Sequence, residues 1–264
     1  MDCFVCDTPL RPFIEKDFGG AYGLDRVHYE RCPSCGLAIS RTHYEMSDAA
    51  WGELNSSYHL AYQGTDNNQD DPRWLERQAR QAQVLAALHG AGVAPARTTW
   101  LDYAAGDGSL ADDLAARGVP TDKYERYLPN PGPGYLDAGA LRPGAFDLVL
   151  TTCVFEHLRG GAPFEAIQRL VAPDGVMGLH TLIREEIPAD PAWFYLLAVH
   201  CTFLTNAAMG RLLERWGYAS SLYHVDARLW CFSHDPAQRL TERVAAAGLE
   251  REAVVAEGFA GYWS

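Results

Sequence analysis

The chain has 264 residues and a mass of 29.1 kDa, enough for one large domain or for a large domain with a small one. Apolar residues make up 48% and charged residues 21%, which is too hydrophobic for a disordered chain. The formal net charge of −12 repels phosphate backbones and disfavours nucleic acid as a partner. No apolar run approaches the roughly 20 residues that span a bilayer, and no leader peptide is visible, so we expect a cytoplasmic protein without a membrane partner.

The first part of the chain contains two Cys-x-x-Cys pairs, Cys3 with Cys6 and Cys32 with Cys35. Each pair places two thiolates on one tight turn, and two such turns complete a tetrahedral zinc site. Four thiolates leave no open coordination position, so we predict a structural zinc ribbon over residues 1–45 that depends on Zn²⁺ for much of its folding energy. The other cysteines lie in apolar surroundings and are predicted to be buried rather than nucleophilic: Cys153, Cys201 and Cys231.

Residues 46–70 mix aromatic side chains with Asn, Asp, Ser and Gly, which predicts a linker with a short helix. A longer helix then begins at Pro72, with Asp71 as its N-cap, and ends at Gly90. From residue 99 onward, short apolar runs alternate with amphipathic stretches, which is typical of a parallel sheet with helices on both faces.

The predicted strands of this region are 99–103, 123–127, 146–150 and 176–183, followed by a hairpin of 220–225 and 229–233. The predicted helices are 110–117, 164–170, 207–215 and 241–247. Together they define a sheet domain over residues 71–264, with an insertion at 184–205. We expect the insertion to be either a helix packed over the sheet edge or a lid with aromatic walls over a bound acceptor.

Residues 100–110 leave a strand, pass through small residues and enter a helix. Small residues let a ligand approach the backbone, and a helix N-terminus offers unpaired N–H groups. Asp102 lies on the strand just before this turn. Glu125 follows the next strand, where an acid bonds ribose hydroxyls in dinucleotide-binding folds. The pattern indicates a site for a nucleoside-containing cofactor.

Three segments, in this order and spacing, resemble the class I S-adenosylmethionine-dependent methyltransferases: residues 102–108, 146–158 and 170–176. A zinc ribbon in front of such a domain further resembles a bacterial group that acts on sugars, nucleotide sugars and natural products. The resemblance implies an α/β fold, a Rossmann-like, doubly wound sheet of seven strands with a terminal antiparallel hairpin. It also implies methyl transfer from S-adenosyl-L-methionine to a small-molecule acceptor, first of all at oxygen.

The same resemblance assigns cofactor-binding residues. Asp102 supports the glycine loop, while Gly106 and Gly108 let the methionine moiety approach. Glu125 holds the ribose hydroxyls, and Asp137 contacts the adenine amine. The floor beside the sulfonium is lined by three consecutive residues: Thr152, Cys153 and Val154.

The sequence departs from the family pattern at two places. Ala104 replaces the first glycine of the usual loop, and its methyl group narrows the site. The segment between Glu125 and Asp137 is short and rich in proline and glycine, so a loop replaces the usual helix there.

Removal of a proton from the acceptor suits a histidine near pH 7. Three histidines fall near the carboxyl ends of the strands, where ligands bind in doubly wound sheets: His157, His180 and His200. Each is also compatible with a structural role, and the adjacent Glu156 could orient the imidazole of His157.

Two other functions stay open. The chain could be a zinc-ribbon adapter on a methyltransferase fold that no longer binds the cofactor. It could instead methylate RNA, but residues 1–45 carry five Lys and Arg against seven Asp and Glu, without a basic stripe. The acceptor could be free or bound to a carrier, and a homodimer is left open.

Overall fold

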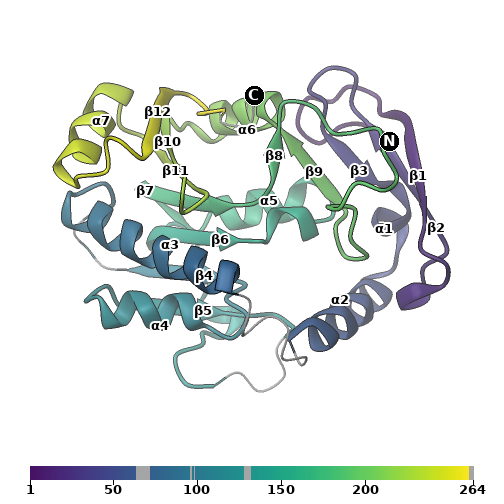
Figure 1. Ribbon diagram of the computed structural model, residues 1–264, viewed down its shortest axis with the longest axis horizontal. Helices are drawn as coiled ribbons and strands as arrows, with labels where there is room; N and C mark the ends of the chain where they lie inside the picture. The colour runs from purple at the N-terminus through teal and green to yellow at the C-terminus, as the bar shows by residue number, and fades with distance from the viewer. Residues whose placement is uncertain (64–71, 96, 98, 128–131, 262–264) are drawn as a thin grey trace.

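The computed structural model describes residues 1–63, 72–95, 97, 99–127 and 132–261, and it contains two β-sheets (Figure 1). The large sheet has seven strands, in the spatial order β12 (Ala253–Glu257), β10 (Ser220–His224), β11 (Leu229–Ser233), β7 (Val171–His180), β6 (Phe146–Thr152), β4 (Trp100–Tyr103) and β5 (Thr121–Tyr124). The small sheet has the order β1 (Arg11–Asp17), β2 (Arg26–Arg31), β3 (Ala38–Ser40), β9 (Thr202–Thr205) and β8 (Ile183–Arg184).

Seven α-helices accompany the sheets in the described ranges: α1 (Arg41–Glu45), α2 (Asp48–Gln63), α3 (Pro72–Gly90), α4 (Ser109–Ala116), α5 (Gly161–Gln168), α6 (Asn206–Trp216) and α7 (Ala237–Ala246). Three short 3-10 helices are η1 (Ala21–Gly23), η2 (Ala138–Ala140) and η3 (Phe155–His157). In the part of the chain that the structure describes, no helix is long and apolar enough to cross a membrane.

The large sheet confirms the predicted α/β architecture. Strands β5, β4, β6 and β7 pair in parallel, and β11 and β10 follow as the antiparallel hairpin. The hairpin is not the edge of the sheet, because β12 adds one more antiparallel strand to β10. The sequence of β12 gives little signal, since none of its five residues is fully buried.

Alternation along the central strands assigns each side chain to one of two apolar layers. On β6, Leu148 and Leu150 belong to the layer formed with α3, α4 and α7, whereas Val149 belongs to the layer formed with α5 and α6. Each fully buried side chain of this kind contributes about 1.5–3 kcal/mol. Since β4, β5, β6 and β7 are parallel and held between the two layers, their carboxyl ends lie along the same side of the sheet, which we call its carboxyl edge.

At the β5 end of the sheet, a single parallel bridge between Lys123 and Tyr135 stands where a further strand would pair. Between β5 and β6 the described residues contain no α-helix, as predicted from the prolines and glycines of this segment. Residues 128–131, which include two of those prolines, lie outside the described residues.

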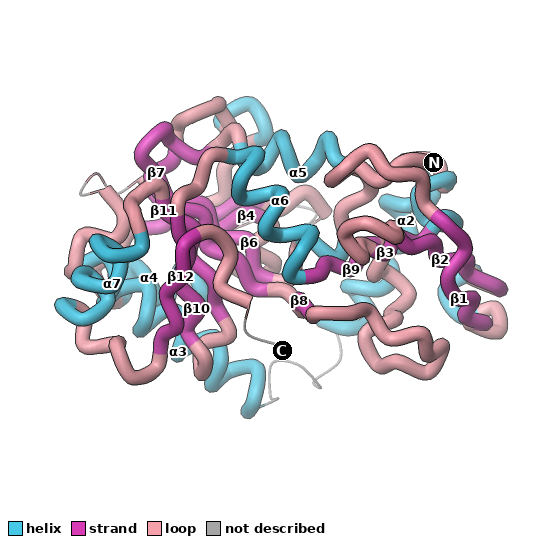
Figure 2. Tube along the Cα trace, turned by 90° about the horizontal axis from the view of Figure 1, so that it is seen from above, coloured by secondary structure: helices cyan, strands magenta, loops and turns pink. Residues whose placement is uncertain are grey.

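The insertion at 184–205 differs from the expectation of a helix, whereas the alternative of a lid over a bound acceptor stays a prediction. It contains no helix, and its β9 pairs with β3 of the ribbon, so segments distant in sequence share one sheet (Figure 2). Pro188 and Pro191 disfavour a helix here. The ring of Trp193 is buried and lies 5.5 Å from that of Phe203, inside the small sheet's apolar layer.

The segment predicted as a linker is mostly helical. α2 has 16 residues, longer than the short helix expected, because Trp51 and Leu54 bury one face of it against the small sheet. The predicted helix from Pro72 to Gly90 is confirmed as α3. Its expected N-cap, Asp71, lies outside the described residues. The division into 1–45, 46–70 and 71–264 stays a prediction.

A matched pair of glycine substitutions tests the packing of the sheet. A Cβ on Gly178 of β7 would lie 2.5 Å from Leu150 Cδ2, so Gly178→Ala should destabilise the fold by about 1–3 kcal/mol through overpacking. A Cβ on Gly210 of α6 meets nothing within 4 Å, so Gly210→Ala should stabilise by about 0.5–1 kcal/mol. Urea unfolding measures both changes, and equal effects would contradict the described packing.

Candidate active site and metal centre

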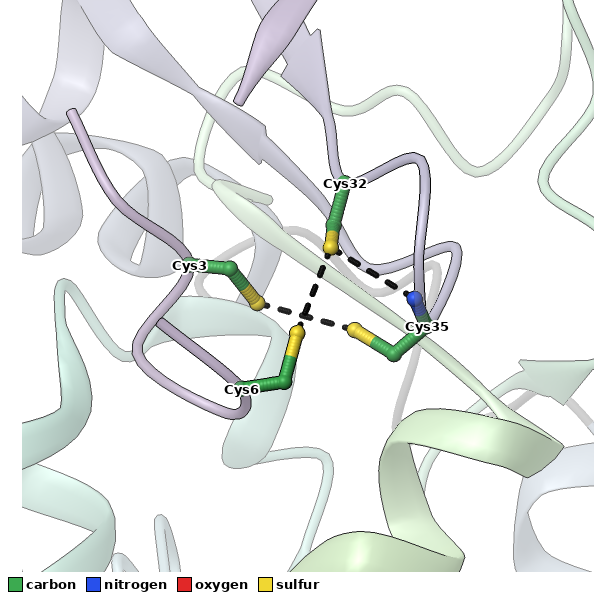
Figure 3. A group of neighbouring side chains, drawn as sticks. All are labelled: Cys3, Cys6, Cys32 and Cys35. Atoms are coloured by element: carbon green, nitrogen blue, oxygen red, sulfur yellow. Dashed lines mark hydrogen bonds between the residues drawn. The ribbon is translucent and has the colours of Figure 1, made fainter. Parts of the chain in front are cut away.

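The four cysteines of the two pairs converge at one point (Figure 3). Sγ of Cys3 lies 3.5 Å from Sγ of Cys35, and Sγ of Cys6 lies 3.4 Å from Sγ of Cys32. All four sulfurs lie within 4.8 Å of one another. In a tetrahedral zinc site with Zn–S distances of about 2.3 Å, the sulfur–sulfur distances are close to these values.

The two turns have the same backbone conformation. In each, the residue after the second cysteine has a left-handed φ, 55° at Asp7 and 75° at Gly36, and its N–H donates to the carbonyl of the first cysteine. The N–H groups of Ser34 and Cys35 also point at Cys32 Sγ, at 3.4 Å. Such N–H donors favour a thiolate. The residues present therefore fit a four-cysteine metal site.

Both turns are attached to helices of the large domain. Thr205, the N-cap of α6, donates a hydrogen bond to the carbonyl of Cys35, and Arg211 donates to Ser34 Oγ at 3.1 Å. Arg215 donates to the carbonyl of Phe4 at 3.1 Å, and the Phe4 ring lies 5.0 Å from that of Phe164 on α5. The N-terminus of α6 thus lies beside the second cysteine turn, and two arginines of α6 hold the two turns.

The predicted cofactor loop leaves β4 in a strained conformation. Ala104 has φ 59°, Gly106 has φ 57° and Gly108 has φ 78°. A left-handed φ costs a non-glycine residue about 1 kcal/mol or more, so Ala104 holds a conformation that the first glycine of the family pattern would adopt without strain.

The structure gives a steric reason for glycine at position 108, in addition to the predicted one. A Cβ there would lie 2.4 Å from Cδ of Lys123 and 2.8 Å from the hydroxyl of Tyr135, so its missing side chain makes room for these residues. The Tyr135 hydroxyl donates to the carbonyl of Gly106 at 2.8 Å, and Lys123 Nζ pairs with Asp112 at 2.7 Å. The loop is therefore supported from β5, a contact that its glycine pattern does not reveal.

Asp102 and Glu125 lie at the same end of the sheet. Asp102 is buried, and its Oδ1 has no hydrogen-bond partner among the described residues. Burial, and then the negative charge of Glu125, raises the pKa of Asp102 to about 7. The two oxygens of Glu125 accept N–H bonds from Gly106 and Tyr127, each at 3.0 Å. A buried carboxylate with an unused oxygen fits a site that receives a cationic ligand.

The residues predicted to form the floor follow β6. Thr152 pairs with His180 in the β6–β7 register, and the N–H of Cys153 donates to the His180 carbonyl at 2.7 Å. Cys153 has φ 57° and is exposed, so the prediction that it is buried is wrong. Val154 is buried, as are Cys201 and Cys231.

His180 is held by the hairpin between β10 and β11. Its Nδ1 lies 2.6 Å from the carbonyl of Arg228, so Nδ1 carries the proton. Burial, and then the charge of Arg77, lowers the pKa of His180 to about 3. The ring is therefore a neutral donor to the hairpin, which favours the structural role for this histidine.

His157 and His200 are brought together. Their ring centroids lie 4.9 Å apart in an edge-to-face arrangement. His200 Nδ1 donates to the carbonyl of Tyr195 at 2.9 Å, which leaves the lone pair on Nε2. Glu156 was expected to orient His157, but its two oxygens accept the hydroxyls of Tyr195 and Thr181, both at 2.8 Å. The carboxylate thus anchors the segment that carries His200.

Asp137 is exposed at the start of η2, where the Leu136 N–H donates to the Lys123 carbonyl. The sequence assigned no role to Lys123 or Arg77, and it offered Tyr195 only as an aromatic wall of a lid. The signal for Tyr195 was its place in an aromatic run; the half-buried Arg77, whose charge acts on His180 and Glu156, stands on α3 without a motif. The roles of all predicted cofactor-binding and catalytic residues stay predictions.

A family model described as "Methyltransferase domain" matches residues 73–252, more than half of the chain. The chain therefore belongs to the methyltransferase domain family. No curated protein sequence matches the chain.

Solved structures with a similar fold include three methyltransferases. The 1,6-didemethyltoxoflavin-N1-methyltransferase of Burkholderia thailandensis, bound to 1,6-didemethyltoxoflavin and S-adenosylhomocysteine, is 15% identical over 75% of this chain and 95% of its own, with a TM-score of 0.48. A SAM-dependent methyltransferase from Archaeoglobus fulgidus is 13% identical over 76% and 99%, with a TM-score of 0.48. Mitomycin 7-O-methyltransferase is 17% identical over 83% and 78%, with a TM-score of 0.43.

The buried carboxylate of Asp102 should make folding stability depend on pH. The pKa of Asp102 is about 7 in the folded protein and lower in the unfolded chain. The free energy of unfolding is therefore highest at about pH 4 and below, where both states are protonated, and it falls as the pH rises through 7. Relative to Asp102→Asn, the wild type should therefore lose up to about 4 kcal/mol between pH 4 and pH 8. Urea unfolding at several pH values measures this, with Asp137→Asn as the exposed control. Parallel pH curves for wild type and Asp102→Asn would contradict the assignment.

Proposed function

We propose that this protein transfers the methyl group of S-adenosyl-L-methionine to a small-molecule acceptor, such as a sugar, a nucleotide sugar or a natural-product intermediate, with oxygen as the first acceptor atom to test. The observation that carries the proposal is the buried Asp102, with an unpartnered oxygen, beneath the left-handed loop at Ala104 and Gly106. Membership of the methyltransferase domain family supports it. The net charge of −12 supports a small molecule over RNA.

The cofactor would be held at the carboxyl ends of β4 and β5. Asp102 and Glu125 contribute negative charge there, and Gly106 keeps the loop free of a side chain. When bound, S-adenosylmethionine supplies a methyl group activated by its sulfonium. The protein's own residues then have to align the acceptor and take its proton.

His200 is the favoured proton acceptor. Its Nδ1–H is fixed on the Tyr195 carbonyl, so the lone pair of Nε2 takes the acceptor's proton and the ring becomes a cation. His157, with its ring 4.9 Å away, is the second candidate in the same position. His180 is disfavoured because burial lowers its pKa to about 3.

The four cysteines would hold a structural Zn²⁺ and take no part in the chemistry. The acceptor could be free or attached to a carrier, and the site does not require a second copy of the chain. A cytoplasmic location agrees with thiols that are kept reduced for metal binding.

Calorimetric titration with S-adenosylmethionine and with S-adenosylhomocysteine tests the cofactor assignment. We expect micromolar binding, about −8 kcal/mol. Asp102→Ala and Glu125→Ala should each weaken binding at least about tenfold, because each removes a carboxylate that favours the cationic ligand or its ribose. Asp113→Ala, at a half-buried position of α4 that pairs with Arg117 and not with the loop, is the control. Folded, zinc-loaded protein that binds neither ligand would instead support the adapter function.

Substitution of the paired histidines tests the proton acceptor. His200→Gln should leave cofactor affinity within about threefold and lower turnover by about 10²–10⁴ in a screen of hydroxylated acceptors. His157→Gln should have the same effect if the two rings act together. His234→Gln, whose Nδ1 lies near the Gly217 carbonyl, is the control. Full turnover in both site variants would rule out a histidine base at this position.

A further inference from the structure

We infer that the zinc ribbon is the device that positions His200, and that Lys16 and His43 of the ribbon are positioning residues for it. This inference rests on the proposed function, since it gives His200 a task. The structure shows a continuous path of backbone and side-chain contacts from the four cysteines to residues 195–203, which we call the histidine segment.

The path begins at the second cysteine turn. This turn connects β2 to β3, and the Cys32 N–H donates to the Leu37 carbonyl at 2.8 Å. β3 then pairs with β9 through Ala38 with Phe203 and Ile39 with Thr202. The position of β9 is therefore set by a strand whose own start is fixed by two of the cysteines.

The ladder extends to the residue next to His200. The N–H of Ser40 donates to the carbonyl of Cys201 at 2.8 Å, and the hydroxyls of Tyr44 and Thr202 are 2.9 Å apart. At its other end β9 is bound to the cysteine turn, because Thr205 donates to the Cys35 carbonyl. Both ends of this short strand are thus held by the ribbon.

Two ribbon side chains bind the backbone on the other side of His200. Lys16 Nζ donates to the carbonyl of Leu196 at 2.6 Å, and His43 Nε2 donates to the carbonyl of Ala198 at 2.9 Å. These carbonyls lie four and two residues before His200. They also lie between His200 and Tyr195, the residue whose carbonyl fixes the tautomer of His200.

His43 binds the histidine segment as a neutral imidazole. It is fully buried, and its Nδ1 lies 2.5 Å from Ser40 Oγ while Nε2 faces the Ala198 carbonyl, so both ring nitrogens are used. Burial, together with the smaller effect of the nearby charge of Arg159, lowers the pKa of His43 to about 4. The groups facing it include the Trp51 ring at 5.5 Å. His43 thus stays neutral, and bonded, throughout the range in which an enzyme works.

The same ribbon helix also holds the segment that carries the second histidine. Arg159, two residues after His157, donates to the carbonyls of His43 and Met46 at 3.1 and 2.6 Å and lies 5.2 Å from the Trp51 ring. The segments that carry the two paired histidines are therefore both bound to α1 and its C-cap. The predicted cofactor loop is instead held by Glu125, which follows β5, and by Tyr135, which is bridged to β5.

The histidine pair and the predicted cofactor loop are thus held by different parts of the chain. We therefore expect that loss of the ribbon's structure disturbs the histidine pair while cofactor binding persists. The tautomer of His200 reports this without any acceptor. We would record nitrogen-15 spectra of histidine-labelled, zinc-loaded full-length protein and assign His200 with His200→Gln. The wild type should show one protonated nitrogen and one lone-pair nitrogen for His200.

His43→Ala and Lys16→Met should each average the two nitrogen signals of His200, and each should leave the affinity for S-adenosylhomocysteine within about threefold. Removal of zinc with a chelator should have the same effect on His200. The control is His28→Ala, since His28 lies on β2, half-exposed, and binds Glu15 at 2.9 Å, away from the histidine segment. It should change neither signal.

Lys16→Met keeps an unbranched chain of similar length at a half-buried position. Unchanged His200 signals in Lys16→Met, together with unchanged signals in His43→Ala or after zinc removal, would overturn the inference. Averaged signals in His28→Ala as well would also overturn it, because the effect would then be unspecific. If His43→Ala does not fold, Lys16→Met decides alone. Failure of the proposed function is distinguishable, because it appears as absent S-adenosylhomocysteine binding in the wild type, whatever the state of His200.

Discussion

The pairing of β3 with β9 is the contact on which the arrangement of both sheets depends. A ribbon of about 45 residues is too small to bury an adequate core of its own. Its cysteines and Val5 instead belong to the apolar layer that contains α5, α6 and the centre of the large sheet. The four-cysteine cluster, the insertion and the sheet domain therefore share one packed interior, so a change at the cluster can influence parts of the chain that are distant in sequence.

Strain and buried charge are concentrated at one edge of the large sheet. Three of the five described non-glycine residues with a left-handed φ lie there, Ala104 after β4, Cys153 after β6 and Arg228 before β11. The buried Asp102 lies at the same edge. Elsewhere the alternation of side chains and the helix caps agree with the fold. Backbone strain and an unpaired buried carboxylate both cost stability. Their occurrence together is expected at a functional site, where ligand binding compensates for that cost.

Local patterns made much of this fold predictable. The cysteine spacing, the strand-to-loop-to-helix step at 100–110 and the apolar runs after residue 99 each depend on residues close in sequence. The insertion was not predictable in this way, because β9 finds its partner in β3, more than 160 residues earlier in the chain. Prolines excluded a helix but did not indicate the strand. For the candidate site, the sequence could place three histidines near the sheet edge. Only the tertiary fold distinguishes the pair His157 and His200 from the hairpin-bound His180.

The described histidines include rings that only bind the backbone and a ring that also lies beside other ionisable groups. His43, His180 and His200 each donate one ring N–H to a backbone carbonyl, which is a way to satisfy carbonyls in irregular segments without adding charge. Two of these rings are so buried that protonation is suppressed, with pKa values of about 4 for His43 and about 3 for His180. Their second nitrogens cannot become cationic near pH 7. His200 uses the same backbone bond but lies beside a second imidazole, and beside a carboxylate whose pKa burial raises. Among the three histidines predicted near this end of the sheet, His157 and His200 therefore share one site with a carboxylate, and residues 1–45 bind the backbone of the segment that carries His200.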